Sequence, residues 1–256
     1  MTADPRIYDS ERVAAAYAHT RPPVHALAWQ RIAARLPLAL PVRSALDIGC
    51  GAGLSTAALQ PYAQQLTGID PFEVMVRRAA AALPTAAIVR GSAEALPFAD
   101  AQFELVSAAG SLNYTAVERS VAEAGRVLAA GGCFVPYDFS TGNRVAGDAL
   151  LLERFPAYRV RFPPPSGYAL DLAALPFAPN GLALLAYEEF DAAVPMTGQA
   201  YNAYLMGDAG VEVAIAAGLA ADDALAWIDQ HFAPVFARGS REVLFNVQIA
   251  IARKRG

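Results

Sequence analysis

The spacing of apolar and polar positions changes repeatedly along the first 139 residues, and each change predicts an element. Short apolar runs alternate with longer stretches in which apolar side chains recur every three to four positions. The short runs predict strands at residues 44–48, 65–70, 86–90, 103–109 and 133–139. The periodic stretches predict helices at residues 12–18, 25–36, 54–60, 72–83 and 117–128. The consecutive prolines Pro22 and Pro23 end the first of these helices.

This alternation predicts parallel pairing, because a parallel pair of strands needs a crossover and cannot be closed by a hairpin. We therefore expect residues 43–139 to form an open, doubly wound sheet, with residues 1–42 as a helical cap in front of it. In such a sheet, ligands bind beyond the carboxyl ends of the strands.

The pattern changes again after Ser140. Residues 141–181 carry many prolines and are expected to be irregular, with at most short helices. Further on, residues 182–194 and 241–254 predict strands, and residues 199–219 and 222–236 predict helices between them. We expect residues 140–256 to insert a lid over the mouth of the site and then to complete the same domain.

Three glycines follow the first predicted strand, at Gly49, Gly51 and Gly53. Glycines at this place let the backbone turn sharply and let a ligand approach it without meeting a Cβ atom. A dinucleotide fingerprint of the form G-x-G-x-x-G would require a further glycine at position 54, where this chain has Leu54. The loop therefore favours another kind of ligand.

Two acids accompany this loop. Asp47 is a costly charge within an apolar strand, and Asp70 ends the next strand, 23 positions later. A carboxylate at the position of Asp70 can accept two hydrogen bonds from a ribose diol, although it could also be an ordinary turn acid before Pro71. Beyond the third strand, the stretch "GSAEALPF" brings Ser92 to the neighbouring strand end, where the edge of an adenine would lie.

Five stretches in order resemble the class I S-adenosylmethionine-dependent methyltransferases, in particular the small-molecule branch called methyltransferase type 11. They are "LDIGCGAG", "GID", "GSAEALPF", "FELVSAAGSLNY" and "EAGRVLAAGGCFVPYDF". The resemblance implies a three-layer α/β/α Rossmann-like sandwich with a seven-stranded, mostly parallel sheet of order 3-2-1-4-5-7-6. Residues 241–254 would be its last strand, antiparallel to the rest and inserted between the fifth and sixth.

The resemblance implies S-adenosyl-L-methionine as cofactor, with S-adenosyl-L-homocysteine as product. Gly49 and Gly51 would back its methionyl part, Asp47 would orient its amino group, and Asp70 would hold its ribose hydroxyls. Ile69 or Phe72 would pack beside the adenine, and the stretch 108–111 would lie under the sulfonium. The complete set expected to bind the cofactor is Tyr17, Arg21, Asp47, Gly49, Cys50, Gly51, Asp70, Pro71, Ser92, Ala93, Glu94 and Ala108.

The chain departs from the family pattern at two places. Relatives commonly carry an aspartate where this chain has Ser92, and a histidine or aromatic pair where it has "LNY" at 112–114. The first departure weakens the expected contact to the adenine amino group. Because of the second departure, the family pattern does not indicate which residues take part in methyl transfer.

The candidates for that step are Tyr114, Tyr137 and His19, together with Asp138 at the same strand end as Tyr137. Each also has a structural interpretation, because a tyrosine or aspartate can simply end a strand and a lone histidine is more often a structural residue. The same holds for four further side chains. They are His25, His231, Tyr201 and Tyr204.

Composition narrows the partners. The chain has 256 residues, 55% of them hydrophobic, and a formal net charge of −4. This balance argues against nucleic acid or an anionic membrane as the main partner and favours small-molecule or protein partners. The resemblance implies that the partner is a small-molecule methyl acceptor. Cys50 and Cys133 show no metal-ligand spacing and are expected to be reduced, small fillers. We expect no metal, a cytoplasmic protein without a leader, and a monomer or homodimer.

The expected reaction moves a methyl group to an oxygen, nitrogen, sulfur or carbon atom of a small molecule by in-line displacement. Two alternatives stay open. One is a non-catalytic S-adenosylmethionine-binding module, because the sequence motif does not fix the residues at the transfer point. The other is an NAD-dependent oxidoreductase, which Leu54 and the lack of a Tyr-x-x-x-Lys pair disfavour.

Overall fold

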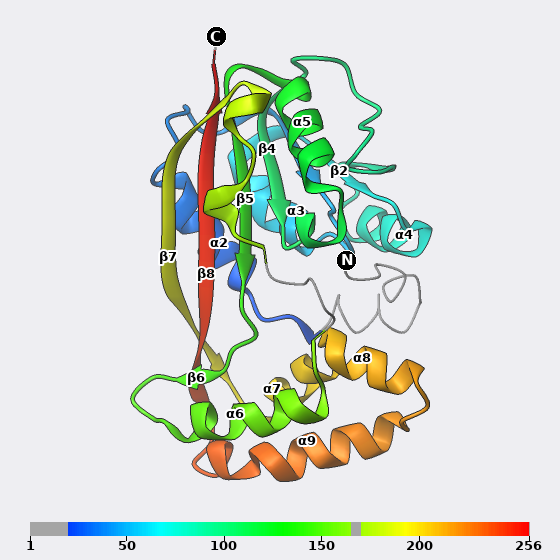
Figure 1. Ribbon diagram of the computed structural model, residues 1–256, viewed down its shortest axis with the longest axis vertical. Helices are drawn as coiled ribbons and strands as arrows, with labels where there is room; N and C mark the ends of the chain where they lie inside the picture. The colour runs from blue at the N-terminus through cyan, green and yellow to red at the C-terminus, as the bar shows by residue number, and fades with distance from the viewer. Residues whose placement is uncertain (1–19, 165–169, 256) are drawn as a thin grey trace.

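The computed structural model describes residues 20–164 and 170–255, and the strands within these ranges belong to one sheet (Figure 1). The strands are β1 (Val42–Ile48), β2 (Ala63–Asp70), β3 (Ala87–Arg90), β4 (Phe103–Ala109), β5 (Leu128–Phe139), β6 (Arg144–Val145), β7 (Leu182–Met196) and β8 (Arg241–Lys254). The α-helices are α2 (Val24–Ala33), α3 (Leu54–Leu59), α4 (Glu73–Ala82), α5 (Val117–Val127), α6 (Leu150–Arg161), α7 (Gly198–Met206), α8 (Ala209–Ala216) and α9 (Ala221–Phe236). The 3-10 turns are η2 (Gln60–Tyr62), η3 (Leu112–Tyr114), η4 (Leu172–Ala174) and η5 (Ala178–Asn180).

The strand order is β3-β2-β1-β4-β5-β8-β6, and β7 also pairs with β8. Strands β1 to β5 are parallel, whereas β8 runs antiparallel to β5 and to β7. The predicted order 3-2-1-4-5-7-6 is thus confirmed, with β8 as the inserted strand and β7 outside it. The two-residue strand β6 was not predicted. The division into residues 1–42, 43–139 and 140–256 stays a prediction.

Helices cover both faces of the sheet, which confirms the three-layer arrangement (Figure 1). Successive side chains of a strand point to opposite faces. Ala45 of β1 therefore packs in the core under α2 and α3, and Leu46 packs in the core under α5. Because both faces of the central strands are buried in these two cores, their sequences are continuous apolar runs.

The proline-rich stretch 141–181 is more regular than expected, because α6 runs through Pro156. Its Leu151, Phe155 and Tyr158 are buried among aromatic side chains of α9 and its neighbours. Apolar burial of this size offsets the hydrogen bond that a proline removes from a helix. The expectation of only short helices here is therefore wrong.

Two further boundaries differ from the sequence expectation. The helix predicted at 199–219 is divided into α7 and α8, because the Asp208 carboxylate accepts a hydrogen bond from the Gly210 N–H (3.0 Å) and begins a new helix. Strand β5 starts at Leu128 and not at the predicted residue 133, so residues 128–132 belong to it. There Gly131 has a φ of 76°, and the pairing register with β4 shifts.

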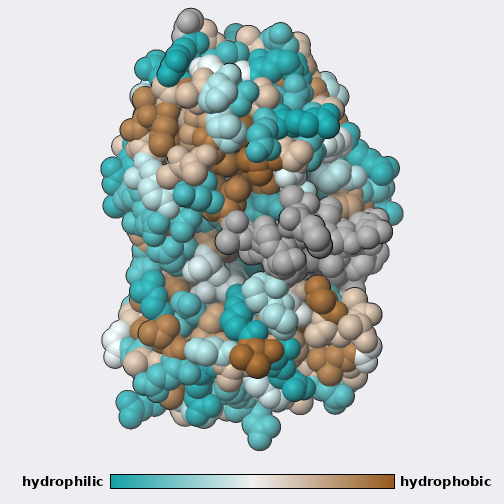
Figure 2. All heavy atoms as spheres, in the orientation of Figure 1, coloured by the Kyte–Doolittle hydropathy of each residue, from teal (hydrophilic) through white to brown (hydrophobic). Residues whose placement is uncertain are grey.

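Strands β7 and β8 extend past β5, and α6, α7 and α9 pack around their far end as a separate helical layer (Figure 1). Its core is aromatic and includes Tyr201, Phe232 and Phe245. On the face shown in Figure 2, polar side chains predominate over this layer, with apolar ones between them. Across the described ranges, no helix combines the length and the apolar character needed to cross a membrane.

One buried carboxylate joins the layers next to the site. Asp47 is fully buried and accepts hydrogen bonds from Ser55 Oγ (2.6 Å), Thr56 Oγ1 (2.7 Å) and Ser107 Oγ (2.7 Å). Ser55 and Thr56 belong to α3, and Ser107 belongs to β4. Burial raises the pKa of Asp47, and the three hydroxyl donors act against that rise. The Asp47 carboxylate, a costly charge within an apolar strand, therefore connects β1 to α3 and β4 by hydrogen bonds.

We expect Asp47→Ala to lower the free energy of unfolding by about 2–4 kcal/mol, because three buried hydroxyls lose their acceptor. The control is Ser107→Ala, which removes a single donor and should cost about 1 kcal/mol. Urea unfolding of both variants measures the difference. An Asp47→Ala loss no larger than the Ser107→Ala loss would contradict this account.

Candidate functional site

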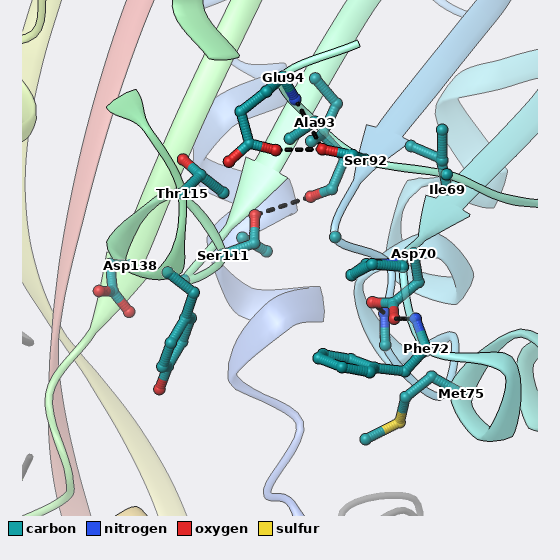
Figure 3. Close-up of a pocket in the computed structure, with 18 of the residues that line it drawn as sticks. Ile69, Asp70, Phe72, Met75, Ser92, Ala93, Glu94, Ser111, Thr115 and Asp138 are labelled. Carbon is teal, nitrogen blue, oxygen red and sulfur yellow. Dashed lines mark hydrogen bonds between the residues drawn. The ribbon is translucent and has the colours of Figure 1, made fainter. Parts of the chain in front are cut away.

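A cavity of about 310 Å³ opens where the strands β1 to β5 end, beside the start of α2. Residues at or just after the carboxyl end of each of these five strands line it, as expected for an open α/β sheet. The volume lies within the range of small-molecule sites. Figure 3 shows Asp70, Phe72 and Met75 on one side of the cavity and Thr115 and Asp138 on the opposite side.

The glycine loop after β1 is held between the neighbouring strand ends. The N–H groups of Gly49 and Cys50 both donate to the carbonyl of Ile69, at 2.8 and 3.0 Å. Gly49 has a φ of 70°, and a Cβ atom there would lie 2.3 Å from Ser111 Cβ. Ser111 is itself fixed, since its hydroxyl donates to the Ile48 carbonyl (2.8 Å). Only glycine fits at position 49.

Asp70 lines the cavity and shapes the loop at the same time. Its Oδ2 accepts the Gly51 N–H and its Oδ1 accepts the Phe72 N–H, each at 3.0 Å. Burial raises the pKa of Asp70 and the nearby charge of Asp47 adds to the rise, while the two backbone donors oppose it. A carboxylate oxygen can accept two hydrogen bonds. Each oxygen therefore keeps one acceptor position for a ligand.

The loop after β3 forms another wall of the cavity, with an apolar slot beside it. The Ser92 hydroxyl donates to Glu94, whose other oxygen accepts the Ala116 N–H (2.9 Å). Burial acts to raise the pKa of Glu94, but these hydrogen bonds and the charge of Arg119 outweigh it and lower the pKa. Figure 3 shows Ala93 and Ile69 beside this pair. Such a slot, apolar with a polar rim, suits a flat heterocyclic base.

Arg126 anchors the same loop from behind. Its guanidinium donates to the carbonyls of Leu96 (2.9 Å) and Phe98 (2.8 Å), and it forms ion pairs with Glu123 and Asp100. The hydrogen bonds and charges of Glu123 and then of Asp100 raise the pKa of Arg126. The position of the slot is therefore set by α5.

Arg21, His25, Tyr114 and Asp138 line the other end of the cavity. Asp138 accepts hydrogen bonds from Asn113 Nδ2 (3.1 Å) and from the Phe139 N–H (2.7 Å). Burial raises its pKa, and those two donors and the charge of Arg21 oppose the rise.

His25 lines this end of the cavity, and its Nδ1 lies 2.9 Å from the Tyr137 hydroxyl. Burial, together with the charge of Arg21, lowers the pKa of His25 to about 3. The imidazole is therefore neutral at physiological pH.

Most of the residues that the sequence assigned to the site meet at this cavity. The lining residues among them are Arg21, Gly49, Gly51, Asp70, Pro71, Ser92, Ala93, Glu94 and Tyr114. Tyr17 and His19 lie outside the described residues. The roles assigned to individual residues stay predictions.

Four assigned residues lie beneath the surface of the cavity and do not line it: Asp47, Cys50, Ala108 and Tyr137. Asp47 is covered by its hydroxyl donors, so any effect on a cofactor's amino group would pass through the loop above it. Cys50 packs against Gly68, and burial raises the pKa of its thiol. Tyr137 is 1% exposed, and its hydroxyl lies 2.9 Å from Nδ1 of His25, which does line the cavity.

Several residues that build the site were not predicted from the sequence. Met75 and Thr115 line it, and Asn113 and Arg126 position other lining groups. Met75 follows Phe72 by three positions, which places both on one side of the start of α4. The contacts of Asn113 and Arg126 join segments that are distant in the sequence, so no local sequence pattern indicates them. Within the described ranges, no three His, Cys, Asp or Glu side chains gather where they could hold a metal ion.

Residues 46–135 match the protein family described as "Methyltransferase domain". This part of the chain is a methyltransferase domain. The match covers the strands and loops that build the cavity from Gly49 to Thr115. It confirms the resemblance of the sequence to the class I S-adenosylmethionine-dependent methyltransferases of type 11.

Individual relatives agree over the same region. An uncharacterized methyltransferase of Bacillus subtilis, YcgJ, is 33% identical over 99 residues, which are 36% of this chain and 39% of the relative. A protein of Mycolicibacterium smegmatis, named a "probable S-adenosylmethionine-dependent methyltransferase", is 31% identical over 127 residues, which are 47% of this chain and 45% of the relative. The matches thus span less than half the length of these curated relatives.

The fold of the methyltransferase domain and its extensions is also similar to a solved structure. A protein of Anaeromyxobacter dehalogenans, provisionally assigned as a type II methyltransferase, aligns with a TM-score of 0.69. The alignment covers 90% of this chain and 95% of that one, at 22% sequence identity. At this identity the likeness concerns the fold alone.

The residues around the cavity fit S-adenosylmethionine, the cofactor of this family. Among the described residues, the lining contains three carboxylates, Asp70, Glu94 and Asp138, and one guanidinium, Arg21, which together carry a formal charge of −2. A cavity with this balance favours a cationic ligand such as a sulfonium. The free acceptor positions of Asp70 suit a ribose diol, and the slot at Ala93 suits a base.

We expect Gly49→Ala to lower both stability and cofactor affinity, because the new Cβ atom would press against Ser111. The matched control is Gly147→Ala, since Gly147 has the same φ of 70° but open space where its Cβ would lie. Both variants should lose about 1–2 kcal/mol from the left-handed backbone, and Gly49→Ala should lose a further 1–3 kcal/mol or so from the clash. Urea unfolding and calorimetry with S-adenosylhomocysteine measure the two effects. Equal losses in the two variants would refute the role given to the contact with Ser111.

Proposed function

We propose that this protein transfers the methyl group of S-adenosylmethionine to a nucleophilic atom of a small molecule. The observation that carries the proposal is Asp70, a buried carboxylate held by two backbone N–H groups with its remaining acceptor positions available to the cavity. The family match supports methyl transfer for residues 46–135. The proposal extends this activity to the whole protein.

Bound S-adenosylmethionine supplies a methyl group that is already activated by a positive sulfur. The protein then has to hold an acceptor in line with it, and positioning of this kind can contribute about 7–11 kcal/mol to lowering a barrier. The glycine loop gives close approach to the methionyl part, and the stretch from Ala109 to Ser111 lies beneath the middle of the cavity. The end at Arg21, Tyr114 and Asp138 is left for the acceptor.

An NAD-dependent reaction fits the same cavity less well. A dinucleotide places its pyrophosphate at the N-terminus of the helix after β1. Here that helix, α3, has only six residues and begins at Leu54, where the dinucleotide fingerprint has glycine. The carboxylates of Asp70 and Glu94 would also repel phosphate groups. A non-catalytic module with the same cofactor site is the remaining alternative, and only turnover separates it from an enzyme.

The acceptor is proposed to be a small molecule because the cavity is closed in on several sides and has a volume of about 310 Å³. We keep the expectation that nucleic acid and membranes are not partners, on the ground of the acidic balance of the chain. A cytoplasmic location, in a monomer or homodimer, is part of the same proposal. The two cysteines, which are free and buried, are compatible with a reducing compartment.

Asp70→Ala should weaken the binding of S-adenosylhomocysteine by about 2–4 kcal/mol, because the ribose hydroxyls lose charge-assisted hydrogen bonds. Calorimetry measures the affinity. The control is Asp148→Ala, since Asp148 also accepts a backbone N–H, from Leu150 (2.8 Å), but does not line the cavity. An unchanged affinity in Asp70→Ala would remove Asp70 from the cofactor site.

The same calorimetric experiment with NAD tests the reaction class. We expect S-adenosylhomocysteine to bind wild-type protein and NAD to bind at least tenfold more weakly, because the six-residue helix α3 and Leu54 give a poor site for a pyrophosphate. A preference for NAD would overturn the proposed function. Binding of S-adenosylhomocysteine without methyl transfer to any compound in a metabolite library would favour the non-catalytic module.

A further inference from the structure

At the acceptor end of the cavity, the described residues supply one carboxylate, that of Asp138, which the cofactor does not need. Asp70 and Glu94 are engaged on the nucleoside side, whereas Asp138 lies across the cavity from Asp70 (Figure 3). It is the next-to-last residue of β5, and its Oδ1 would be 3.0 Å from a Cβ atom at Gly110. Gly110 belongs to the stretch under the middle of the cavity, so Asp138 stands beside the expected point of transfer.

The contacts of Asp138 fix its carboxylate without neutralising it. Asn113 Nδ2 donates to Oδ2 and the Phe139 N–H donates to Oδ1, and both donors are uncharged. Within the described residues, no lysine or arginine forms an ion pair with Asp138. Each oxygen keeps a further acceptor position, as in Asp70. The result is an oriented carboxylate that can receive a hydrogen bond, and then a proton, from a bound molecule.

The other groups around Asp138 are consistent with a proton-accepting role. Arg21 and His25 reach this end from the start of α2, and Tyr114 and Asn113 reach it from the segment after β4. His25 is neutral there, and its Nε2 has no hydrogen-bond partner among the described residues. The raised pKa of Asp138 brings its basicity closer to neutrality than that of an exposed carboxylate.

We propose that Asp138 is the general base of the transfer step and that the acceptor therefore presents an O–H or N–H group to it. This inference rests on the proposed function and narrows the range of acceptor atoms. A lone pair of the acceptor oxygen or nitrogen forms the bond to the methyl carbon. The bond between that carbon and sulfur breaks, with its electron pair going to sulfur. The proton of the O–H or N–H group passes to Asp138 and then to solvent.

Thiols and carbon acids fit this arrangement less well. A thiol ionises close to neutral pH without help, because its unperturbed pKa is about 8.5, and it gains little from a base. A carbon acid needs a much stronger base than a carboxylate. The site also offers flat walls, since the rings of His25 and Phe139 meet edge to face with centroids 5.1 Å apart. An aromatic hydroxyl or amine suits both the walls and the base.

A binding experiment tests the contact without any turnover. The probe is 4-nitrophenol, whose phenolate absorbs visible light and whose neutral form does not, added to protein saturated with S-adenosylhomocysteine. In the wild-type complex, the Asp138 charge should keep the bound probe as the neutral phenol. In Asp138→Asn, which keeps the shape but not the charge, the apparent pKa of the bound probe should fall by at least one unit.

Turnover then tests the base. Wild-type protein is given S-adenosylmethionine with phenol, benzylamine or thiophenol. Asp138→Asn should lower kcat with phenol and benzylamine by a factor on the order of 10² to 10⁴, the usual contribution of a general base. Transfer to thiophenol should change less than about threefold, since thiolate needs no base. The rise of kcat/KM for phenol through the pKa of Asp138 should disappear in the variant.

The matched control is Asp171→Asn, because Asp171 also accepts a nearby backbone N–H, from Ala173 (2.9 Å), and lies outside the cavity. It should behave as wild type in both experiments. Asp138→Asn should also bind S-adenosylhomocysteine with unchanged affinity. That result separates the two proposals, since loss of cofactor binding in wild-type protein would defeat the proposed function itself.

Three outcomes would overturn the assignment of Asp138. One is an equal apparent pKa of the bound probe in wild type and in Asp138→Asn, or no binding of the probe. Another is transfer to phenol and benzylamine that survives the substitution. The third is wild-type protein that binds S-adenosylhomocysteine and methylates thiophenol alone, or none of the three compounds, which would exclude the acceptor class while leaving the cofactor site in place.

Discussion

The site depends on the hydrogen bonds between Asp47 and three hydroxyl groups. A carboxylate without access to water is unfavourable unless donors surround it, and Ser55, Thr56 and Ser107 provide them from α3 and β4. Because these donors come from different elements, the bonds fix the end of β1 relative to its neighbours. The glycine loop begins two residues later at Gly49, so its backbone starts from a defined position.

The other carboxylates around the cavity are also held by hydrogen bonds from uncharged donors. Backbone N–H groups bind Asp70, a hydroxyl and an N–H bind Glu94, and an amide and an N–H bind Asp138. Ion pairs would have cancelled these charges. The N–H, hydroxyl and amide donors orient the carboxylates without cancelling their charge, and this charge makes the cavity attractive to a cation.

Local patterns were sufficient to predict the sheet and the cofactor end, because apolar periodicity and residues next to strand ends carry that information. Strand β4 and strand β8 lie where their apolar runs indicated. The helix through Pro156 was missed, since its stability comes from aromatic packing across the helical layer and not from its own sequence. Asp138 stood at a strand end and was noticed, but the donor that orients it, Asn113, comes from another segment and gave no signal.

Arg21 connects two regions that are distant in the sequence. Its guanidinium donates to the Gly207 carbonyl (3.1 Å) and lies over the ring of Tyr204, at the junction of α7 and α8. The end of the cavity that we propose for the acceptor is thereby linked to the helical layer, whereas the end proposed for the nucleoside rests on the sheet and α5. In evolution, the helical layer could change to suit a new acceptor while the cofactor half kept its fit, so the two halves of the site can be selected separately.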